Sequence, residues 1–283
     1  MDALGDRMKA YEDEFNIKIE PYYPFIIRLD GKNFSKFTNG FKKPFDPEFV
    51  KAMVLTMNDL VEKFNPNTGY CHSDEITLVF PPACTKEEFD AKENKSIHPH
   101  DGRVIKFCTV LSGYCSARFN NHISSLIREK PSEYPKTFLE KVESNECCFD
   151  ARPLKFPFDK PGEVVNHMIW RSVYDCHRNA VSTYARYMLG HKKATGLNSA
   201  QMIDEMKKLK LDWENDVPMH LKHGVYAKKE LYEKIVEIKG QEIKATRQRI
   251  TNRTFKIEYS ENMVELMFSK YWSDDKPGLE FSI

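Results

Sequence analysis

The order of apolar and polar positions predicts a strand, a helix and a second strand before residue 80. The stretch FIIRLDGKNF (25–34) is an apolar run that stops at an Asp-Gly pair. FDPEFVKAMVLTMNDLVEKF (45–64) begins with an Asp-Pro helix start and then repeats its apolar residues at helical spacing. After the break at NPNTG, YCHSDEITLVF (70–80) alternates as a strand does. The three elements indicate the start of an α/β layer, in which a crossover between parallel strands would be right-handed.

The same periodicity predicts further helices and one more strand along the chain. CTKEEFDAKENKSIHPHD (84–101) is polar and irregular, so we expect an exposed loop there. Helices are expected at 103–129, at 161–190 and, with Asn198 as its cap, at 199–210. CCFDARPLKFP (147–157) is expected to form a strand. The last 45 or so residues are mixed and include the basic stretch IKATRQRITNRTFKIE.

Composition indicates a soluble globular protein and says little about its partners. The 283 residues are 41% hydrophobic, enough for one large domain or two small ones. The 43 Lys and Arg balance 42 Asp and Glu, so net charge neither indicates nor excludes a nucleic acid. Seven cysteines without a C-x-x-C pair indicate reduced thiols, with no disulfide framework or zinc site. No apolar stretch reaches the roughly 18 residues of a membrane span, so we expect no membrane and a cytoplasmic location, with nucleus and organelles left open.

Two interpretations fit Asp30-Gly31 at the end of the first strand. Asp-Gly is a strong signal for a two-residue hairpin turn when alternating strands flank it on both sides. The following KNFSKFTNG places its aromatic residues three apart and then reaches turn residues, which weakens the hairpin interpretation. The alternative is that Asp30 holds a ligand at the end of a buried strand.

A second carboxylate, Asp74, precedes the alternating strand in HSDEITLVF. If the two strands are antiparallel neighbours, the end of one lies beside the start of the other, and Asp30 and Asp74 face each other. Paired carboxylates repel, which raises one pKa unless a divalent cation neutralises them. Mg²⁺ suits such a pair, because it takes one or two carboxylates and completes its shell with waters and substrate phosphates. Each acid taken alone could equally be a helix cap or a solvated turn residue.

Basic and polar residues that could meet a triphosphate occur around these acids. A glycine at position 31 would let a metal ion or a phosphate approach the backbone, and its carbonyl could serve as a ligand. We therefore expect Gly31→Val to spare the strand and crowd a bound nucleotide. The other candidates, each of which could also be an ordinary surface residue, are Lys32, Asn33, Ser35, Lys43, Arg103 and Lys106.

Six stretches in order resemble the tRNA(His) guanylyltransferase family and its wider group of guanylyltransferase-like 3′-to-5′ polymerases. They extend from about residue 1 to residue 229 and are IIRLDGKNFSKF, FKKPFD, GYCHSDEITLVF, CCFDARPLKFP, WRSVYDCHRNAV and DVPMHLKHGV. The resemblance implies an α/β (α+β) fold with a palm-like catalytic core, an antiparallel sheet and flanking helices. It implies a nucleotide- and metal-binding core over 1–150, and over 151–283 the rest of the core with a helical tRNA-contacting region and a basic C-terminal segment.

The activity that the resemblance implies is addition of nucleotides to the 5′ end of a tRNA after activation of its 5′-monophosphate by ATP or GTP. Asp30, the Gly31 backbone and Asp74 would hold two Mg²⁺ ions for phosphoryl transfer. The residues expected to line the triphosphate are Asp30, Gly31, Lys32, Asn33, Phe34, Ser35, Ser73 and Asp74, with Lys43, Arg103 and Lys106 as looser matches. Family members are usually tetramers, so a homotetramer is implied.

Departures from the family pattern favour the branch that repairs truncated tRNA 5′ ends over a dedicated tRNA(His) enzyme. The family's His-Ile-Asn-Asn block reads HRNA here: His177 and Asn179 remain, but Arg178 and Ala180 replace an apolar residue and an asparagine. Alanine cannot hydrogen-bond a base edge, so strict reading of one tRNA is in doubt, and FDAR stands where FDGR is usual. His177 could instead be a packing histidine.

Basic residues near the C-terminus are candidates for contact with the tRNA backbone, since clustered Lys and Arg supply sequence-independent affinity. We expect Arg247, Arg249 and Arg253 to contact tRNA together with His177 and Asn179. The three arginines could equally form a solvated face. Two rival functions remain. A palm-type nucleotide cyclase would have no use for the HRNA block or the basic segment, and a non-catalytic tRNA-binding protein would not need Asp30, Gly31 and Asp74.

Overall fold

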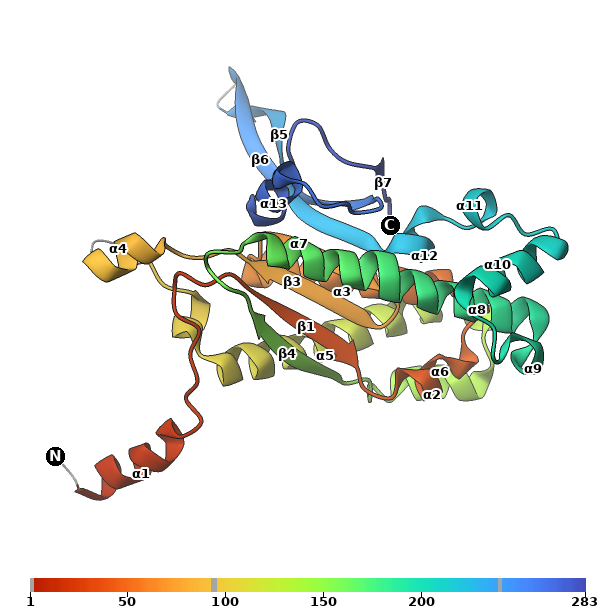
Figure 1. The fold of residues 1–283 in the computed structure, drawn as a ribbon, viewed down its shortest axis with the longest axis horizontal. Helices are drawn as coiled ribbons and strands as arrows, with labels where there is room; N and C mark the ends of the chain where they lie inside the picture. The colour runs from red at the N-terminus through yellow and green to blue at the C-terminus, as the bar shows by residue number, and fades with distance from the viewer. Residues whose placement is uncertain (1–2, 93–95, 239–240) are drawn as a thin grey trace.

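The computed structural model describes residues 3–92, 96–238 and 241–283 and contains one seven-stranded sheet flanked by helices (Figure 1). The strand order is β4-β1-β3-β2-β5-β6-β7, and every neighbouring pair is antiparallel. The strands are β1 (Phe25–Gly31), β2 (Thr68–His72), β3 (Glu75–Phe80), β4 (Phe149–Lys155), β5 (Val225–Ile238), β6 (Gln241–Thr254) and β7 (Leu279–Glu280). The mixed α/β fold with an antiparallel sheet is thus confirmed.

Helices form close to the four ranges that the sequence predicts, and further short helices occur that the sequence analysis does not predict. They are α1 (Ala3–Asp13), α2 (Phe34–Phe37), α3 (Pro47–Phe64), α4 (Lys86–Ala91), α5 (Val104–Arg128), α6 (Lys136–Glu143), α7 (Gly162–Ile169), α8 (His177–Leu189), α9 (His191–Ala194), α10 (Ser199–Lys208), α11 (Trp213–Asp216), α12 (Met219–His223) and α13 (Glu261–Phe268). The short 3₁₀ segments are η1 (Thr38–Gly40), η2 (Pro99–Gly102) and η3 (Pro131–Glu133), and η4 (Trp170–Cys176) is π-helical. The helix expected at 161–190 is therefore continuous, but it changes from α to π and back.

Caps and periodicity explain why the predicted helices form. The Asp46 carboxylate accepts hydrogen bonds from the backbone amides of Glu48 and Phe49, and Pro47 occupies the first helical position of α3. Asn198 and Gln201 form a reciprocal capping box at the start of α10. Each cap satisfies backbone amides that have no partner within the helix.

Two predictions for residues 70–101 were wrong in part. YCHSDEITLVF is not one strand, because Ser73 adopts a left-handed φ of 53° and turns the chain between β2 and β3. β1 and β2 are both antiparallel to β3, so they run parallel to each other, and α3 is the crossover that connects them with β3 lying in between. The polar stretch 84–101 is not simply an exposed loop: it contains α4, which starts with a capping box, and His98, which is buried against the Phe25 ring. Residues 93–95 of that stretch lie outside the described residues.

Helices cover both faces of the sheet. α3 and α5 pack on the face that carries Ile27 and Leu29, and they form the larger core with them. α7 and α13 pack on the opposite face, against Ile26 and Val79. The long helix α7-η4-α8 thus runs across the face on which the alternate β1 residues Arg28 and Asp30 lie (Figure 1). This arrangement places polar helix residues next to the end of β1.

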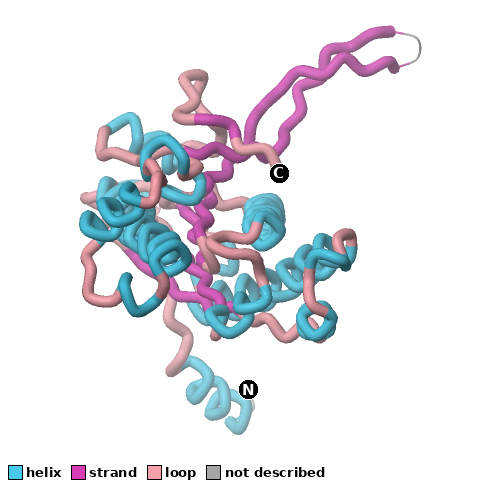
Figure 2. Tube along the Cα trace, turned by 90° about the vertical axis from the view of Figure 1, so that its right-hand side faces the viewer, coloured by secondary structure: helices cyan, strands magenta, loops and turns pink. Residues whose placement is uncertain are grey.

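Two elements extend from this body. α1 has no buried residue and stands clear of the sheet (Figure 1). The β5-β6 hairpin projects as a two-stranded arm (Figure 2), and the basic stretch is its second strand. None of the helices described in residues 3–92, 96–238 and 241–283 is long and apolar enough to cross a membrane. The division proposed at residue 150 falls inside β4, which pairs with β1, and it stays a prediction.

Candidate active site

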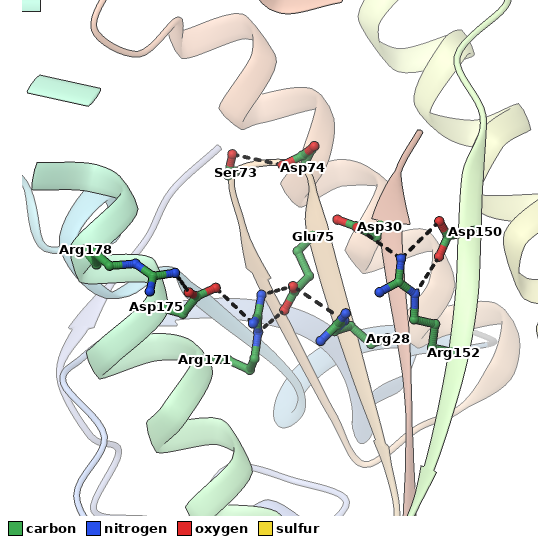
Figure 3. A network of polar contacts seen from close by, with 10 residues as sticks. All are labelled: Arg28, Asp30, Ser73, Asp74, Glu75, Asp150, Arg152, Arg171, Asp175 and Arg178. Carbon is green, nitrogen blue, oxygen red and sulfur yellow. Dashed lines mark hydrogen bonds and ion pairs between the residues drawn. The ribbon is translucent and has the colours of Figure 1, made fainter. Parts of the chain in front are cut away.

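Asp30 and Asp74 come together where β1 ends and the β2-β3 turn begins. Asp30 is directly opposite Glu75 in the β1-β3 register, and the Gly31 amide donates a hydrogen bond of 3.0 Å to the Asp74 carbonyl. The Ser73 hydroxyl donates to the Asp74 carboxylate at 3.1 Å, across the turn seen in Figure 3. The juxtaposition expected from antiparallel strand ends is therefore present.

A small pocket of about 110 Å³ lies over these acids. Its polar lining residues include Asp30, Ser73, Asp74, Arg171, Asp175 and Asn179. The first three come from the β1 and β2-β3 ends, and the other three come from η4 and the start of α8. The pocket thus forms only because the long helix crosses the sheet at the end of β1.

The electrostatics of the pocket favour a cation. Burial raises the pKa of Asp74, and the nearby Asp30 carboxylate raises it further. Arg152 of β4 lies 3.6 Å from Asp30, but its side chain is 54% exposed and also pairs with Asp150. A bound divalent cation would remove the repulsion between Asp30 and Asp74. No cluster of three or more His, Cys, Asp or Glu side chains suited to a metal occurs in the described residues. Two carboxylates are nevertheless a ligand set that Mg²⁺ accepts when waters and substrate phosphates complete its shell.

Below the acids, a nearly buried ion-pair chain connects the sheet to the helix. The Arg171 Nε donates to Glu75 Oε1 at 2.8 Å, and a second Arg171 nitrogen contacts the other Glu75 oxygen. Arg171 also pairs with Asp175 at 2.9 Å, and Arg28 lies 3.7 Å from Glu75 (Figure 3). Burial raises the pKa of Glu75, and the two arginines oppose that shift. These ion pairs connect Glu75, the residue that follows Asp74, to η4.

Sequence reasoning did not identify Arg28, Arg171 and Asp175 as parts of the site. Arg171 and Asp175 lie in the quoted block WRSVYDCHRNAV, where their spacing of four residues indicated only a shared helix face. The contact between Arg171 and Glu75 joins positions 96 residues apart, so only the tertiary structure brings them together.

The loop that follows β1 exposes three of the expected phosphate contacts. Lys32, Asn33 and Ser35 are solvent-exposed, and the Lys32 amide is held by the Cys148 carbonyl at 2.9 Å. Lys43 is also exposed, and its ammonium donates to the Thr38 carbonyl at 3.0 Å. Their roles toward a nucleotide stay predictions.

Phe34 does not line the pocket. Its ring is 3% exposed and packs against other aromatic rings of the main core, including those of Phe119 and Phe149. A contact of Phe34 with a nucleotide stays a prediction, and it would come from the backbone, because burial of the apolar ring in the core is favourable.

Arg103 and Lys106 lie at the far end of β1 from Asp30. They flank the start of α5, where Phe107 packs on Phe25 with ring centroids 5.1 Å apart. Phe25 begins β1, and five strand steps at about 3.3 Å each separate it from Asp30, about 17 Å in all. Within one chain, these two basic residues do not share the pocket with Asp30 and Asp74.

The expected tRNA contacts are placed unequally. Asn179 is exposed and lines the pocket. His177 is half-buried and accepts a hydrogen bond of 3.0 Å from the Trp213 indole, so its ring packs within the helical region, and its contact with tRNA stays a prediction. Burial lowers the pKa of His177. Ala180 is fully buried, so its side chain does not contact a partner, and the specificity argument drawn from this position stays a prediction.

The basic residues of β6 are mostly engaged within the chain. Arg249 pairs with Glu230 at 2.8 Å, and Arg253 donates to two backbone carbonyls of residues 277 and 278. Arg247 is exposed on the projecting arm. Of the three arginines, Arg247 is thus best placed to meet a partner.

The Phe34 ring requires a glycine at position 31, as any ligand there would. A Cβ at this position would lie 2.4 Å from the Phe34 ring, which is fixed in the core. The expectation that Gly31→Val spares the strand is therefore wrong, because the added Cβ would clash with the Phe34 ring at the end of β1.

We predict that Gly31→Ala lowers the free energy of unfolding by about 2 kcal/mol, within the range found for overpacked cores. Urea denaturation followed by circular dichroism would measure the change. The matched control is Gly113→Ala, where an added Cβ meets nothing within 4 Å. Equal unfolding midpoints for the two variants would contradict the clash.

The comparisons with known proteins agree with this geometry. The sequence model of the family described as Thg1, tRNAHis guanylyltransferase, matches residues 5–157. Uncharacterized protein R259 of Acanthamoeba polyphaga mimivirus is 39% identical over 97% of this chain and 92% of its own length. The probable tRNA(His) guanylyltransferase of Mus musculus is 21% identical over 79% of this chain and 70% of its own.

Solved structures show the same similarity. A bacterial tRNA(His) guanylyltransferase (Thg1)-like protein in complex with ATP aligns with a TM-score of 0.65 and 27% identity, covering 86% of this chain and 92% of that chain. A bacterial Thg1-like protein in complex with GTP aligns with a TM-score of 0.57 and 25% identity, covering 87% and 91%. By sequence, by fold and by the match that spans more than half of its length, this chain belongs to the tRNAHis guanylyltransferase (Thg1) family of nucleotidyltransferases.

Proposed function

We propose that this chain extends the 5′ ends of tRNAs in the 3′-to-5′ direction, using ATP or GTP for activation, and that it repairs truncated 5′ ends. The observation that carries the proposal is the pairing of Asp30 and Asp74 in a pocket at the end of β1. Two neighbouring carboxylates with basic side chains close by suit a site of phosphoryl transfer. The ATP and GTP complexes of the bacterial Thg1-like proteins support nucleoside triphosphates as substrates.

Asp30 and Asp74, with the Gly31 carbonyl, would hold two Mg²⁺ ions. When bound, such ions lower the pKa of an attacking hydroxyl and neutralise charge on the departing phosphates. The Glu75-Arg171 pair would keep the β2-β3 turn, and hence Asp74, in position against the helix. Lys32, Asn33 and Ser35 are free to meet phosphate oxygens from the exposed loop after β1.

The proposed reaction has two steps. The tRNA 5′-phosphate first attacks the α-phosphorus of ATP or GTP, which releases pyrophosphate and leaves a nucleotidylated 5′ end. The 3′-hydroxyl of the incoming nucleotide then attacks the tRNA 5′-phosphorus, forms the new phosphodiester bond and expels the activating nucleoside monophosphate. The proton lost by the 3′-hydroxyl leaves to solvent.

Arg178 favours repair over addition of a single G to tRNA(His). It replaces an apolar residue beside the retained His177 and Asn179. Its charged side chain is 68% exposed beside the pocket, where sequence-independent attraction to phosphates is its natural role. The dedicated tRNA(His) enzyme remains the second candidate. Homotetramer formation is part of the proposal by family resemblance.

Comparing two RNA substrates tests this proposal. We expect kcat/KM for labelled GTP incorporation to be at least about tenfold higher on a tRNA that lacks its first nucleotide than on full-length tRNA(His). A preference for tRNA(His) would establish the dedicated activity instead. Absence of incorporation on both RNAs by folded protein would overturn the proposal as a whole.

A further inference from the structure

The π-helical segment arranges its side chains in two parallel rows. The i→i+5 hydrogen bonds of η4 widen the helical turn, so residues four apart lie close to one line along the axis. The inner row, defined as Arg171, Asp175 and Asn179, faces the pocket that contains Asp30 and Asp74. The outer row is defined as Trp170, Tyr174 and Arg178, each of which immediately precedes a residue of the inner row. This outer row faces solvent.

The outer row exposes an unusual amount of aromatic surface. Trp170 is 50% exposed and Tyr174 is 66% exposed. Isolated exposed aromatic residues are common, but here two lie one helical turn apart beside a candidate active site. Half or more of each side chain is in contact with solvent, so this surface is available for a partner.

The side chains around Trp170 hold its ring in a fixed place. The Arg171 guanidinium lies over the ring at 5.0 Å from its centroid, and the His167 ring contacts it edge-on at 5.6 Å. Arg171 is itself fixed by Glu75, so the indole is oriented by the same ion-pair chain that supports the pocket. A pre-oriented ring loses little entropy when a ligand stacks on it.

The chemistry of the outer row fits an unpaired nucleic acid strand. Flat aromatic faces stack on bases, and a guanidinium in line with them meets the phosphates between those bases. Arg178 contacts Asp175, yet 68% of its side chain is exposed. An apolar protein partner would instead require a wide aliphatic surface, whereas this row alternates with charged residues of the inner row.

We propose that the outer row stacks unpaired nucleotides of the RNA substrate next to the 5′ end that reacts in the pocket. This inference rests on the proposed function for the identity of the RNA. Its direct support is continuity, since consecutive residues of one helix line the pocket and form the row.

Intrinsic tryptophan fluorescence provides a direct test on the full-length protein. The chain has three tryptophans, and Trp213 and Trp272 are only 3% and 7% exposed, so Trp170 is the exposed fluorophore. Titration with a 5′-phosphorylated single-stranded RNA hexamer should quench its emission, because a stacked base contacts the indole directly. A blunt RNA duplex of equal length should quench less at the same salt concentration.

Variants assign the effect to the row. Tyr174→Ala should weaken hexamer binding about tenfold, the scale of one lost stacked base, and Arg178→Ala should weaken it and reduce its salt dependence. Tyr11→Ala is the matched control, since Tyr11 is a 61% exposed tyrosine on the detached helix α1. It should leave both quenching and affinity unchanged.

The outcomes separate this inference from the proposed function, because binding is measured without nucleotides or turnover. No quenching, equal quenching by the duplex, or equal effects of Tyr174→Ala and Tyr11→Ala would overturn the stacking role, even if nucleotide addition occurs. Quenching that depends on Tyr174 would support it, even if incorporation into tRNA is absent.

Discussion

Replacing Asp30 or Asp74 by asparagine is expected to reduce incorporation of labelled GTP at a tRNA 5′ end by at least about a thousandfold, since each is proposed to hold the ions on which the transfer depends. Asparagine keeps the shape of the side chain and removes the negative charge. The measurement is Mg²⁺-dependent incorporation into a tRNA transcript that lacks its first nucleotide. Asp90→Asn, an exposed acid on α4, is the matched control and should retain full activity.

The same variants have a predictable effect on stability. Folding raises the pKa of Asp74, so the folded state disfavours its ionised form. The resulting loss of folding stability is absent below the pKa of the unfolded state, near 3.8. It is complete once the pH has risen through the higher pKa of the folded state. Without Mg²⁺ at pH 7, Asp74→Asn should therefore melt at a higher temperature than the wild type, and the difference should vanish in acid. Added Mg²⁺ should raise the melting temperature of the wild type only.

Two outcomes would contradict the metal-site proposal. Full incorporation by Asp74→Asn would show that the carboxylate pair is not the place of phosphoryl transfer. Loss of activity together with a lower melting temperature would show that Asp74 is structural and not a strained ligand.

Replacing Arg171 by methionine is expected to lower the free energy of unfolding by about 3 kcal/mol or more, because it leaves the Glu75 carboxylate buried without its main partner. The two side chains are only 15% and 10% exposed, so solvent screens this pair weakly. Incorporation should fall as well, since Glu75 follows Asp74 at the start of β3. Urea denaturation and the tRNA assay would measure the two effects.

A double variant separates the pair from its parts. Glu75→Gln combined with Arg171→Met removes both charges, so it should be more stable than Arg171→Met alone. Arg178→Met is the matched control for stability, since that arginine lies on the same helix but is 68% exposed, and its loss should cost less than about 1 kcal/mol. Equal costs for Arg171→Met and Arg178→Met would show that the Glu75 contact contributes little.

Local rules were sufficient for much of the fold. The Asp-Pro start of α3 and the Asn198 capping box are short-range hydrogen-bond patterns, so they could be predicted from neighbouring residues. The β2-β3 turn could not, because Ser73 adopts positive φ without the glycine or asparagine that normally announces such a turn. The alternation of apolar and polar residues continues across this turn, which is the pattern of one unbroken strand.

The sequence by itself determined the α/β character, the helix starts and the pair of acids at two strand ends, since these depend on periodicity, caps and the geometry of neighbouring strands. Only the tertiary structure decided what surrounds the acids. It buried Phe34 and Ala180, placed Arg103 and Lys106 at the far end of β1, and brought Arg171 to Glu75. The physical reason is that burial and long-range ion pairing depend on how a helix crosses a sheet, and no local pattern in one chain encodes that crossing.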